Sequence, residues 1–431
     1  MATLNYTAAQ IGALLAKADT SVQPATTGDL DNLATSTKTN LVAAINETFQ
    51  SVSDGKTLIA AAITDKGVAT AATDSFSTMA TNIAAIPTGG AAEVEQKDVN
   101  FIDYDGTILY SYSAADFLNL SAMPNNPSHT GLTARGWNWD LNDAKTYVQL
   151  NGGLWIGQTY YDANGATEID IELQTGRLEP YLRLSVNGTV SIDWGDGSTA
   201  DTLTGTSLTT VLNKKHTYSA AGAYTIKITP TSGTIRLNAG YNNAILSKNS
   251  GTGSLNRIYA AAIKAVRIGT SVDAIGTYAF YYACHLLAMV VPSGVGLSSG
   301  YAFQYSNIQK ISLPKGVTFG TYTFADATSL YGISLPSGVS TIPNSFCYDC
   351  CSLVKIVIPS EISSLGTSAF SSCYGLAEIH FKGTTPPTLT NSNTFSSLPT
   401  DCIIYVPTGK LNDYKTASYY PDPNTYTYVE E

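Results

Sequence analysis

The chain has 431 residues, more than one ordinary domain holds, so we expect roughly two to four domains. Its formal net charge is −10 and its lysines and arginines form no basic stripe, which argues against nucleic acid and anionic membrane surfaces as partners. No run of about 20 apolar residues occurs, so no membrane-spanning helix is expected. Only 13% of the residues are charged whereas 27 are tyrosines, a composition that suits recognition surfaces.

The first 90 residues are rich in alanine and threonine and predict short helices with apolar residues at helical spacing. The predicted helices span residues 6–18, 37–52, 56–64 and 73–86. They are weakly hydrophobic and bury little surface alone, so we expect a partner surface or self-association. They show no sustained heptad seam, and the sequence does not decide whether the chain forms a homo-oligomer such as a trimer.

Two segments of this region, residues 33–47 and 54–68, resemble elements of tailed-phage tail and fibre proteins, and residues 79–86 continue the second pattern. The resemblance implies that residues 1–90 attach the protein to a virion tail or baseplate. The alternative interpretation is a low-complexity helical spacer.

The start of the chain lacks the features of a secretion signal. Residues 1–7 contain no basic n-region, and the stretch from Ile11 to Ala18 is short and includes Lys17. We therefore expect a protein that is made in a host cytoplasm, is released by another route such as cell lysis, and is located on the virion tail.

Residues 91–177 predict a small α+β module. Residues 99–104 and 107–112 alternate as strands around an Asp-Gly hairpin turn, and a helix is expected at 114–120. With the Pro-x-x-Pro and Gly-Trp motifs that follow, this order resembles the small β-grasp repeats of bacterial surface adhesins.

A helix at residues 142–150 and a strand pair around residues 162–165 extend this module. Trp137 and Trp139 lie two residues apart. Because successive side chains of a strand point to opposite faces, one tryptophan is expected to face the core and the other to face out.

Residues 178–230 predict a β-rich module. Strands at 182–186 and 190–194 lead into Gly-Asp-Gly, and His-Thr-Tyr and Gly-Ala-Tyr-Thr-Ile motifs follow. These motifs resemble the polycystic-kidney-disease-type (PKD) β-sandwich, a small Ig-like module. The segment is short for that fold, so we expect a strand to be missing or borrowed from the neighbouring repeats.

The carboxylates Asp193 and Asp196 lie in the Asp-Trp-Gly-Asp-Gly motif of this module. Glycines supply positive φ in such turns and aspartates bond the backbone, so we expect a structural turn, with His216 in a structural hydrogen bond. Calcium binding and acid–base catalysis are the alternatives.

From about residue 267 to residue 407 one pattern repeats: an Ile-x-Leu-Pro segment, then Phe, then Leu and Ile. The repeat prolines are Pro292, Pro314, Pro336 and Pro359, and the repeat phenylalanines are Phe280, Phe303, Phe324, Phe346 and Phe370. A fixed period in the low twenties indicates a solenoid, in which neighbouring coils bury a shared apolar column. Each proline is expected to end a short strand because it has no N–H for the ladder.

These repeats resemble BspA-type leucine-rich repeats, a family of mostly surface and adhesive proteins, so the resemblance implies binding rather than catalysis. We predict the following limits: solenoid 231–420, capping coils 235–237 and 258–266, last strand 403–407, closing helix 410–420 and polar tail 421–431.

All six cysteines lie in the repeat region. Cys350 and Cys373 each precede a repeat leucine by three residues, so we expect free thiols that act as small core hydrophobes. Disulfides are the alternative. A zinc site is not expected, because the Cys-x-x-Cys at Cys347 has no second half and no nearby histidine pair.

Six tyrosines of the solenoid are the predicted receptor-binding residues. Tyr278, Tyr301 and Tyr322 lie two residues before a repeat phenylalanine, and Tyr282, Tyr305 and Tyr348 lie two after. The first three should stack as a ladder whose aromatic faces can grip sugar rings or a protein surface. The alternative is that all six cover the edge of the phenylalanine column.

Nothing in the sequence indicates catalysis. The four histidines are isolated, no nucleophile elbow occurs, and we expect no catalytic residues, cofactor or metal. We predict a multidomain, mainly β protein: an α-helical region (1–90), a β-grasp-like module (91–177), a PKD/Ig-like β-sandwich (178–230) and a leucine-rich-repeat solenoid (231–420). The two β modules are expected to act as spacers.

The functional expectation is a structural phage-tail protein that binds tail or baseplate proteins through its N-terminal region. Its solenoid would bind a bacterial surface glycan or protein. A BspA-type bacterial surface adhesin and a tail-associated enzyme that degrades the cell surface are the alternatives.

Overall fold

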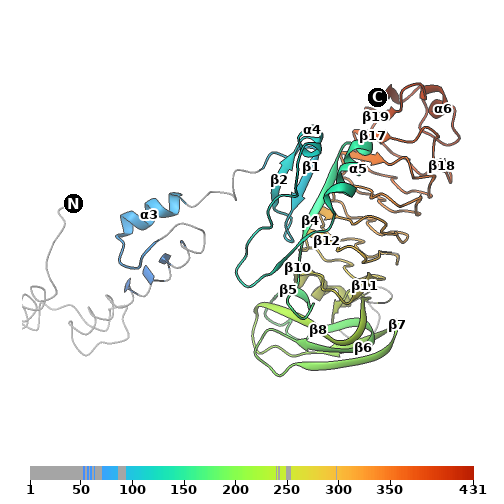
Figure 1. The fold of residues 1–431 in the computed structure, drawn as a ribbon. Coiled ribbons are helices and arrows are strands. Elements are labelled where there is room, and N and C mark those ends of the chain that lie inside the picture. Colours follow the sequence, from blue (N-terminus) through green and yellow to red (C-terminus); the bar gives the residue numbers. More distant parts are fainter. Residues whose placement is uncertain are drawn as a thin grey trace, which may run out of the picture. The chain divides into compact units, whose positions relative to one another are not determined.

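The computed structural model describes residues 94–431 except 239, 241–242, 249–253 and 298; before residue 94 it describes 52–53, 56–57, 59–60, 63 and 70–85. The chain divides into two compact units, residues 1–93 and 94–431. Figure 1 shows the elements of both.

The first unit contains helix α3, Phe76–Ala85, within the range predicted for the fourth helix. Ala60, Ile63 and Met79 form a small buried cluster. Phe76 is 57% exposed, with Lys56 Nζ 5.5 Å from its ring centroid, so its ring takes no part in that cluster. The predicted helix at 6–18 and nearly all of the one at 37–52 lie outside the described residues.

The module at the start of the second unit has a four-stranded sheet in the order β2-β1-β4-β3. The strands are β1 (Val99–Ile102), β2 (Ile108–Tyr112), β3 (Ala134–Trp137) and β4 (Leu154–Tyr160). The pairing of β1 with β2 is antiparallel and confirms the predicted hairpin, with Gly106 at φ +89° in its turn. β1 and β4 run parallel.

Two helices cover the module: α4 (Ala114–Leu118), with Ser113 as N-cap, and α5 (Leu141–Asn151), with Asp140 as N-cap. The prediction that one of the two tryptophans faces out is wrong. Trp137 packs edge-on against Phe101 at 4.8 Å, and Trp139 is 4% exposed. Trp139 escapes the strand alternation because it lies beyond the end of β3.

A seven-stranded sheet follows, in the order β10-β5-β8-β6-β7, with β11 on β8 and β9 on β6. Its strands are β5 (Thr167–Leu173), β6 (Tyr181–Asp193), β7 (Asp201–Lys215), β8 (Gly222–Leu237), β9 (Leu246–Ser247), β10 (Ile263–Arg267) and β11 (Val272–Ile275). The predicted strands at 182–186 and 190–194 are one continuous strand, β6. The predicted strand pair around residues 162–165 is wrong, since β4 and β5 flank that turn but belong to different sheets.

This sheet caps the solenoid. A solenoid exposes its first apolar coil unless another element covers it. Here β5 pairs with β10 and the end of β8 pairs with β11, placing Ile235 opposite Val272. The predicted cap at 235–237 is confirmed, and β10 overlaps the second predicted cap, after the 3-10 helix η2 (Ser254–Ala262).

Each solenoid coil contributes to two faces of short parallel strands and to one turn face. The first face contains β12 (Ala288–Val290), β13 (Lys310–Ser312), β15 (Lys355–Ile358), β17 (Glu378–Phe381), β19 (Ile403–Val406) and β20 (Thr427–Glu430). The second contains β14 (Thr341–Ile342), β16 (Ser364–Leu365) and β18 (Thr388–Leu389). Because the apolar side chains between the faces stack from coil to coil, the core is one continuous column.

The C-terminal end differs from the prediction in two ways. The closing helix is only α6, Leu411–Lys415, rather than residues 410–420. The expected polar tail is instead ordered: β20 pairs in parallel with β19, placing Tyr428 opposite Ile404. Tyr428 is buried, so an apolar side chain within the supposed tail completes the core.

The phenylalanine column is shifted by one residue in one coil. The Phe280 N–H donates to the carbonyl of Ala302, just before Phe303, and the Cys347 N–H donates to the carbonyl of Ala369, just before Phe370. The Phe324 N–H, however, donates to the carbonyl of Phe346 itself. Cys347 therefore takes the column position, and Phe346 packs beside it.

Candidate ligand-binding cleft

The repeat prolines leave a row of backbone carbonyls without their ladder donors. In a parallel ladder, the carbonyl of one coil accepts from an N–H of the next coil. Val290 lies opposite Ser312, so the group that would reach the Val291 carbonyl is the nitrogen of Pro314, which has no hydrogen. The same repeat register places Pro336 against the carbonyl of Leu313.

The first module supplies the missing donors, one side chain to each coil. Asn138 Nδ2 donates to the Val291 carbonyl at 2.9 Å, and Trp139 Nε1 donates to that of Leu313 at 2.8 Å. The Tyr147 hydroxyl donates to the carbonyl of Leu335, which precedes the third proline, at 2.6 Å.

The coil of β17 lacks the repeat proline, and there the ladder hydrogen bond forms. In the β17 coil, Lys382 occupies the position of the repeat proline, and its N–H donates to the Ile358 carbonyl at 3.0 Å. That carbonyl needs no donor from the module. The module therefore docks on those coils whose carbonyls face a proline of the next coil.

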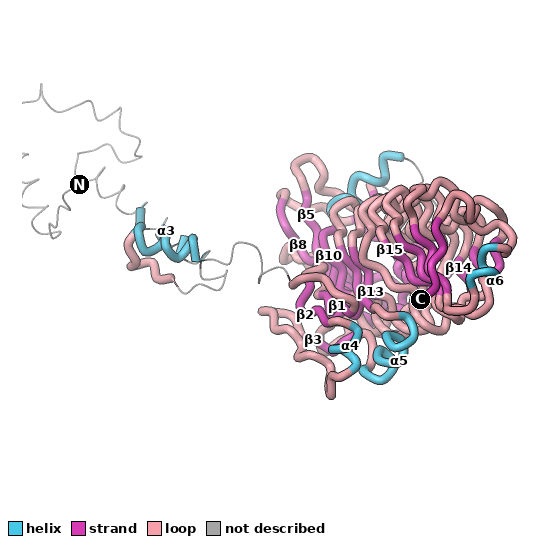
Figure 2. The backbone as a smooth tube through the Cα atoms, turned by 90° about the horizontal axis from the view of Figure 1, so that it is seen from above, coloured by secondary structure: helices cyan, strands magenta, loops and turns pink. Residues whose placement is uncertain are grey.

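Close packing accompanies these hydrogen bonds. A Cβ added to Gly157 on β4 would lie 2.5 Å from Val290 Cγ1, so only glycine allows this approach. Ile102, Trp155 and Val290 form a buried cluster across the contact, and Lys310 Nζ donates to the Gly106 carbonyl at 2.9 Å. β4 contacts β12 and β13 of the solenoid, and Figure 2 shows the module along the side of the solenoid that carries β13. The module is thus part of one body with the solenoid rather than a spacer in front of it.

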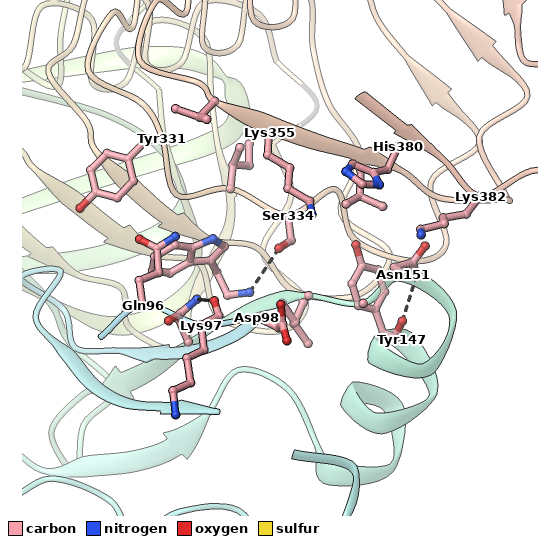
Figure 3. Close-up of a pocket in the computed structure, with 18 of the residues that line it drawn as sticks. Gln96, Lys97, Asp98, Tyr147, Asn151, Tyr331, Ser334, Lys355, His380 and Lys382 are labelled. Carbon is pink, nitrogen blue, oxygen red and sulfur yellow. Dashed lines mark hydrogen bonds between the residues drawn. The ribbon is translucent and has the colours of Figure 1, made fainter. Parts of the chain in front are cut away.

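Beyond the docked coils, a cavity of about 840 Å³ separates the module from the solenoid. The module wall comes from the segment before β1, the end of α5 and the start of β4. The opposite wall comes from β15, β17 and the end of β20. Figure 3 shows Lys355, His380 and Lys382 on the solenoid side and Asp98, Tyr147 and Asn151 on the module side.

The solenoid wall carries a network of paired charges centred on His380. Its two ring nitrogens lie 2.9 Å from Glu378 Oε2 and 3.0 Å from Glu431 Oε2, and its ring stacks on Tyr405 with centroids 4.2 Å apart. Lys382 pairs with Glu431 at 2.6 Å. The hydrogen bond from His380 lowers the pKa of Glu378. Burial raises the pKa of Glu431, but the bonds from Lys382 and His380 outweigh it, so the net shift is downward.

The module wall carries groups that no protein partner satisfies. Asn151 is 6% exposed, and its Oδ1 accepts no hydrogen bond, while its Nδ2 donates to the Tyr147 carbonyl. Lys97 is exposed, and no carboxylate of the described residues pairs with its ammonium. Trp155 meets Tyr331 of the solenoid edge-on at 6.5 Å, which adds an aromatic surface.

The predicted tyrosine ladder exists. The rings of Tyr278, Tyr301 and Tyr322 stack at centroid distances of 4.7 and 4.9 Å with planes within 6° of parallel. Tyr282 and Tyr305 lie 4.7 Å apart in the second line. Contact with a receptor stays a prediction for all of them. These tyrosines lie on the turn face, and none of them lines the cleft.

Tyr348 does not belong to the second line, contrary to the prediction. The one-residue shift at Cys347 puts Asp349 in that position, since its N–H donates to the Ser371 carbonyl as that of Tyr305 does to Ala325. Tyr348 is 38% exposed beside the line.

Sequence reasoning missed that both tyrosine lines have left-handed backbone. The five tyrosines in register have φ between 57° and 66°. Such a conformation costs a non-glycine residue about 1–2 kcal/mol. Serine and aspartate at equivalent positions of later coils, such as Ser345 and Asp349, were the available signal for a strained turn.

The aspartate turn of the second module has the structural role that was expected. Asp193 Oδ1 accepts from the Gly195 N–H, and Asp196 Oδ1 from that of Ser198. His216 Nε2 bonds Asp196 Oδ2 at 2.8 Å, and its ring stacks on Trp194 at 4.6 Å. In the part of the chain that the structure describes, no three potential metal-ligating side chains gather.

All six cysteines are free thiols. Cys350 and Cys373 are fully buried in the core, as predicted. Burial raises the pKa of both well above the ordinary value of a thiol. In the described residues, no helix has both the length and the apolar character that crossing a membrane requires.

Comparison with known proteins bears on the repeats. Residues 256–384 match the BspA type leucine rich repeat region, in six copies. The C-terminal part of the chain is therefore a β-solenoid of BspA-type repeats. No curated protein matches the chain. The match leaves the β-grasp-like and PKD-like resemblances of residues 91–230 as predictions.

One similar solved structure is that of the Pneumococcal vaccine antigen PcpA, at 22% sequence identity and a TM-score of 0.27. The similarity covers 37% of this chain and 44% of that protein, so the chain spans less than half the length of its relative. A TM-score this low does not relate the two folds.

The cleft itself was not predictable from the repeats, because its second wall comes from residues far upstream. The signal was nevertheless present. The Trp-Asn-Trp segment at 137–139 places side-chain donors at two successive positions, and the regular prolines mark carbonyls that lack donors.

Proposed function

We propose that this protein is a non-enzymatic adhesive protein of a tailed-phage virion. Residues 1–90 attach it to tail or baseplate proteins, and the unit of residues 94–431 recognises a glycan or protein on the bacterial host surface. The BspA-type repeats, which are typical of surface adhesins, support the adhesive part. The sequence resemblance of residues 33–47 and 54–68 to phage tail proteins supports the attachment part.

The observation that carries the proposal is the cleft between the docked module and the repeats. It is large enough for a ligand, and its carboxylates already accept hydrogen bonds from groups of the protein. Asp98 accepts from the Ala114 N–H, and Glu431 is held by Lys382 and His380, which lower its pKa. A general acid needs a raised pKa instead, so the lining favours binding over hydrolysis.

In this proposal the β-grasp-like and PKD-like modules hold the recognition surface in place. The first forms one wall of the cleft, and the second caps the repeats through β5 and β8. A homo-oligomer, with the trimer as the first candidate, would present several copies of the cleft and raise avidity.

Binding of the fluorescently labelled full chain to bacterial cells tests the proposal. We expect saturable binding to a subset of strains, and inhibition of phage adsorption on those strains by excess protein. Absence of binding to every strain that the phage infects would overturn it. A reducing-sugar assay on the same cells checks for enzymatic release, and any release contradicts the non-enzymatic assignment.

The BspA-type repeats also favour a second candidate, a surface adhesin of a bacterium. Mass spectrometry of purified virions and of cell-envelope fractions separates the two. The protein should be recovered from virions if the first proposal holds and from the envelope if the second holds.

A further inference from the structure

We infer that the cleft between the first module and the solenoid binds a short saccharide of the bacterial surface, contacting both walls at once. This inference rests on the proposed function and deepens it by naming the site and the ligand class. Residues of the module, such as Asn151 and Gln96, and residues of the repeats, such as Tyr331 and Lys355, would share the ligand.

The size of the cleft suits such a ligand. Small-molecule sites commonly enclose about 300–1,000 Å³, and this cleft encloses about 840 Å³. The two walls are fixed relative to each other by the hydrogen bonds of Asn138, Trp139 and Tyr147 to the coils. The site is therefore preformed, which lowers the conformational entropy that a ligand has to overcome.

The polar lining offers hydrogen-bonding capacity of both kinds. The buried Asn151 Oδ1 lacks a donor, a condition that costs about 1–3 kcal/mol unless a hydroxyl or water supplies one. Ser334, whose Oγ accepts from the Trp155 backbone N–H, can still donate its hydroxyl hydrogen. A polyhydroxylated ligand provides donors and acceptors at close spacing, which matches this set.

The charges of the cleft favour a neutral or weakly anionic ligand. Lys355 lies 3.3 Å from Glu378, and Lys382 lies 2.6 Å from Glu431, so both lysines are neutralised within the protein. Lys97 has no carboxylate partner among the described residues, but its ammonium points away from the solenoid wall (Figure 3). A highly charged polymer would find no matching field here, whereas a sugar needs none.

A peptide fits the cleft less well. An extended peptide usually binds by adding a strand to an open sheet edge. This cleft is lined by one face of β15 and β17, from which Lys355, Val357 and His380 project, rather than by a sheet edge. The ring of Tyr331, which meets Trp155 edge-on, offers instead the apolar surface against which the C–H face of a sugar packs.

The test uses the full chain on a printed array of purified bacterial surface polysaccharides and their oligosaccharide fragments, with peptides on the same slide. Two variants address the cleft. Val354→Trp fills it from a side chain that is 56% exposed, so folding is not at risk, and Tyr331→Ala removes the ring. We expect wild type to bind at least one saccharide and each variant to bind it at least tenfold more weakly.

Matched controls lie outside the cleft. Tyr374→Ala removes a ring that is 61% exposed and lies outside the cleft, and Lys248→Ala removes an exposed lysine; both should bind the saccharide like wild type. Thermal unfolding of every variant shows whether the fold is intact. If Tyr331→Ala proves unstable, Val354→Trp alone decides.

The inference is overturned if wild type binds cells but no printed saccharide, if it binds peptides instead, or if Val354→Trp binds the saccharide like wild type. In those cases the adhesive function stands, because cell binding by wild type is measured separately. Failure of wild type to bind any cell overturns the proposed function itself.

Discussion

The hydroxyl of Tyr147 donates a hydrogen bond to the backbone carbonyl of Leu335, 188 residues further along the chain, at 2.6 Å. Both groups are buried, and burial raises the pKa of the phenol well above its ordinary value. The bond is needed because the next coil offers Pro359 where the carbonyl would find an N–H. A helix of the first module thus completes the hydrogen bonding of the solenoid.

Replacing Tyr147 by phenylalanine should destabilise the unit of residues 94–431 by about 1–3 kcal/mol, because the ring remains but the buried carbonyl loses its donor. Urea unfolding followed by tryptophan fluorescence measures the change. Tyr161→Phe is the matched control, since no described residue bonds the Tyr161 hydroxyl. An equal loss in both variants would show that the Leu335 carbonyl needs no donor.

Gly157→Ala should loosen the docked module, because the new methyl group would lie 2.5 Å from Val290 Cγ1 and 2.9 Å from Ser312 Cβ. Overpacking of this kind costs about 1–3 kcal/mol. Limited proteolysis should cut the variant faster between the module and the solenoid. Adding Val290→Ala should recover part of the stability, and a second mutation that only adds to the loss would place the strain elsewhere.

Asp196 should make the protein acid-sensitive. Burial raises the pKa of this carboxyl, but hydrogen bonds from Ser198 and His216 outweigh it, and the pKa falls from 3.8 to about 2. A carboxyl whose pKa is lower in the folded state stabilises the fold at pH values above its unfolded pKa. This contribution is lost as pH falls from about 5 toward 2. Asp196→Asn should therefore be less stable than wild type at pH 7, by up to roughly 2 kcal/mol, and equal to it near pH 2. Thermal unfolding across that pH range measures both; a gap that stays constant with pH would exclude this origin.

The thiols should react slowly in the native protein. Burial raises the pKa of Cys351 and Cys402 to about 11 and raises those of the other four. Because the thiolate is the nucleophile, a colorimetric thiol reagent at pH 8 should label native protein over hours and unfolded protein at once, at six thiols. Fewer than six thiols in the unfolded, unreduced protein would indicate a disulfide.

The cell-binding assay can also test whether the tyrosine ladder contacts the receptor. If it only covers the phenylalanine column, Tyr301→Ala lowers the melting temperature and leaves cell binding unchanged. If it contacts the receptor, the variant loses binding as well. Tyr301→Phe keeps the stack and separates a role of the hydroxyl from that of the ring.

The solenoid could be predicted because its pattern is local and repeated. Phe280, Phe303 and Phe324 fix the period, and a period alone implies stacked coils. The shift at Cys347 was not visible, because Phe346 and Cys347 are both apolar and either satisfies the pattern. Only the backbone hydrogen bonds decide which of them enters the column.

The cleft could not be predicted for a different reason. Strand and helix signals around Trp139 and Tyr147 describe their own module and are silent about what lies against it. The contact joins side-chain donors to main-chain carbonyls, which only the prolines of the next coil mark in the sequence. The prolines were interpreted as strand ends, which is correct, but their missing hydrogens also create the acceptors.

The docked module has a consequence for how the array can change length. Asn138, Trp139 and Tyr147 reach three successive coils, while β5 and β8 hold the first coil. Inserting or deleting one repeat between the first coil and these three coils would move the carbonyls by one coil, about 4.8 Å. Either the pairing of β5 and β8 with the first coil or the hydrogen bonds from the module would then be lost. Coils beyond β15 are under no such constraint. Growth and loss of repeats during evolution should therefore be confined to the C-terminal side of the array, where new coils would extend the open wall of the cleft.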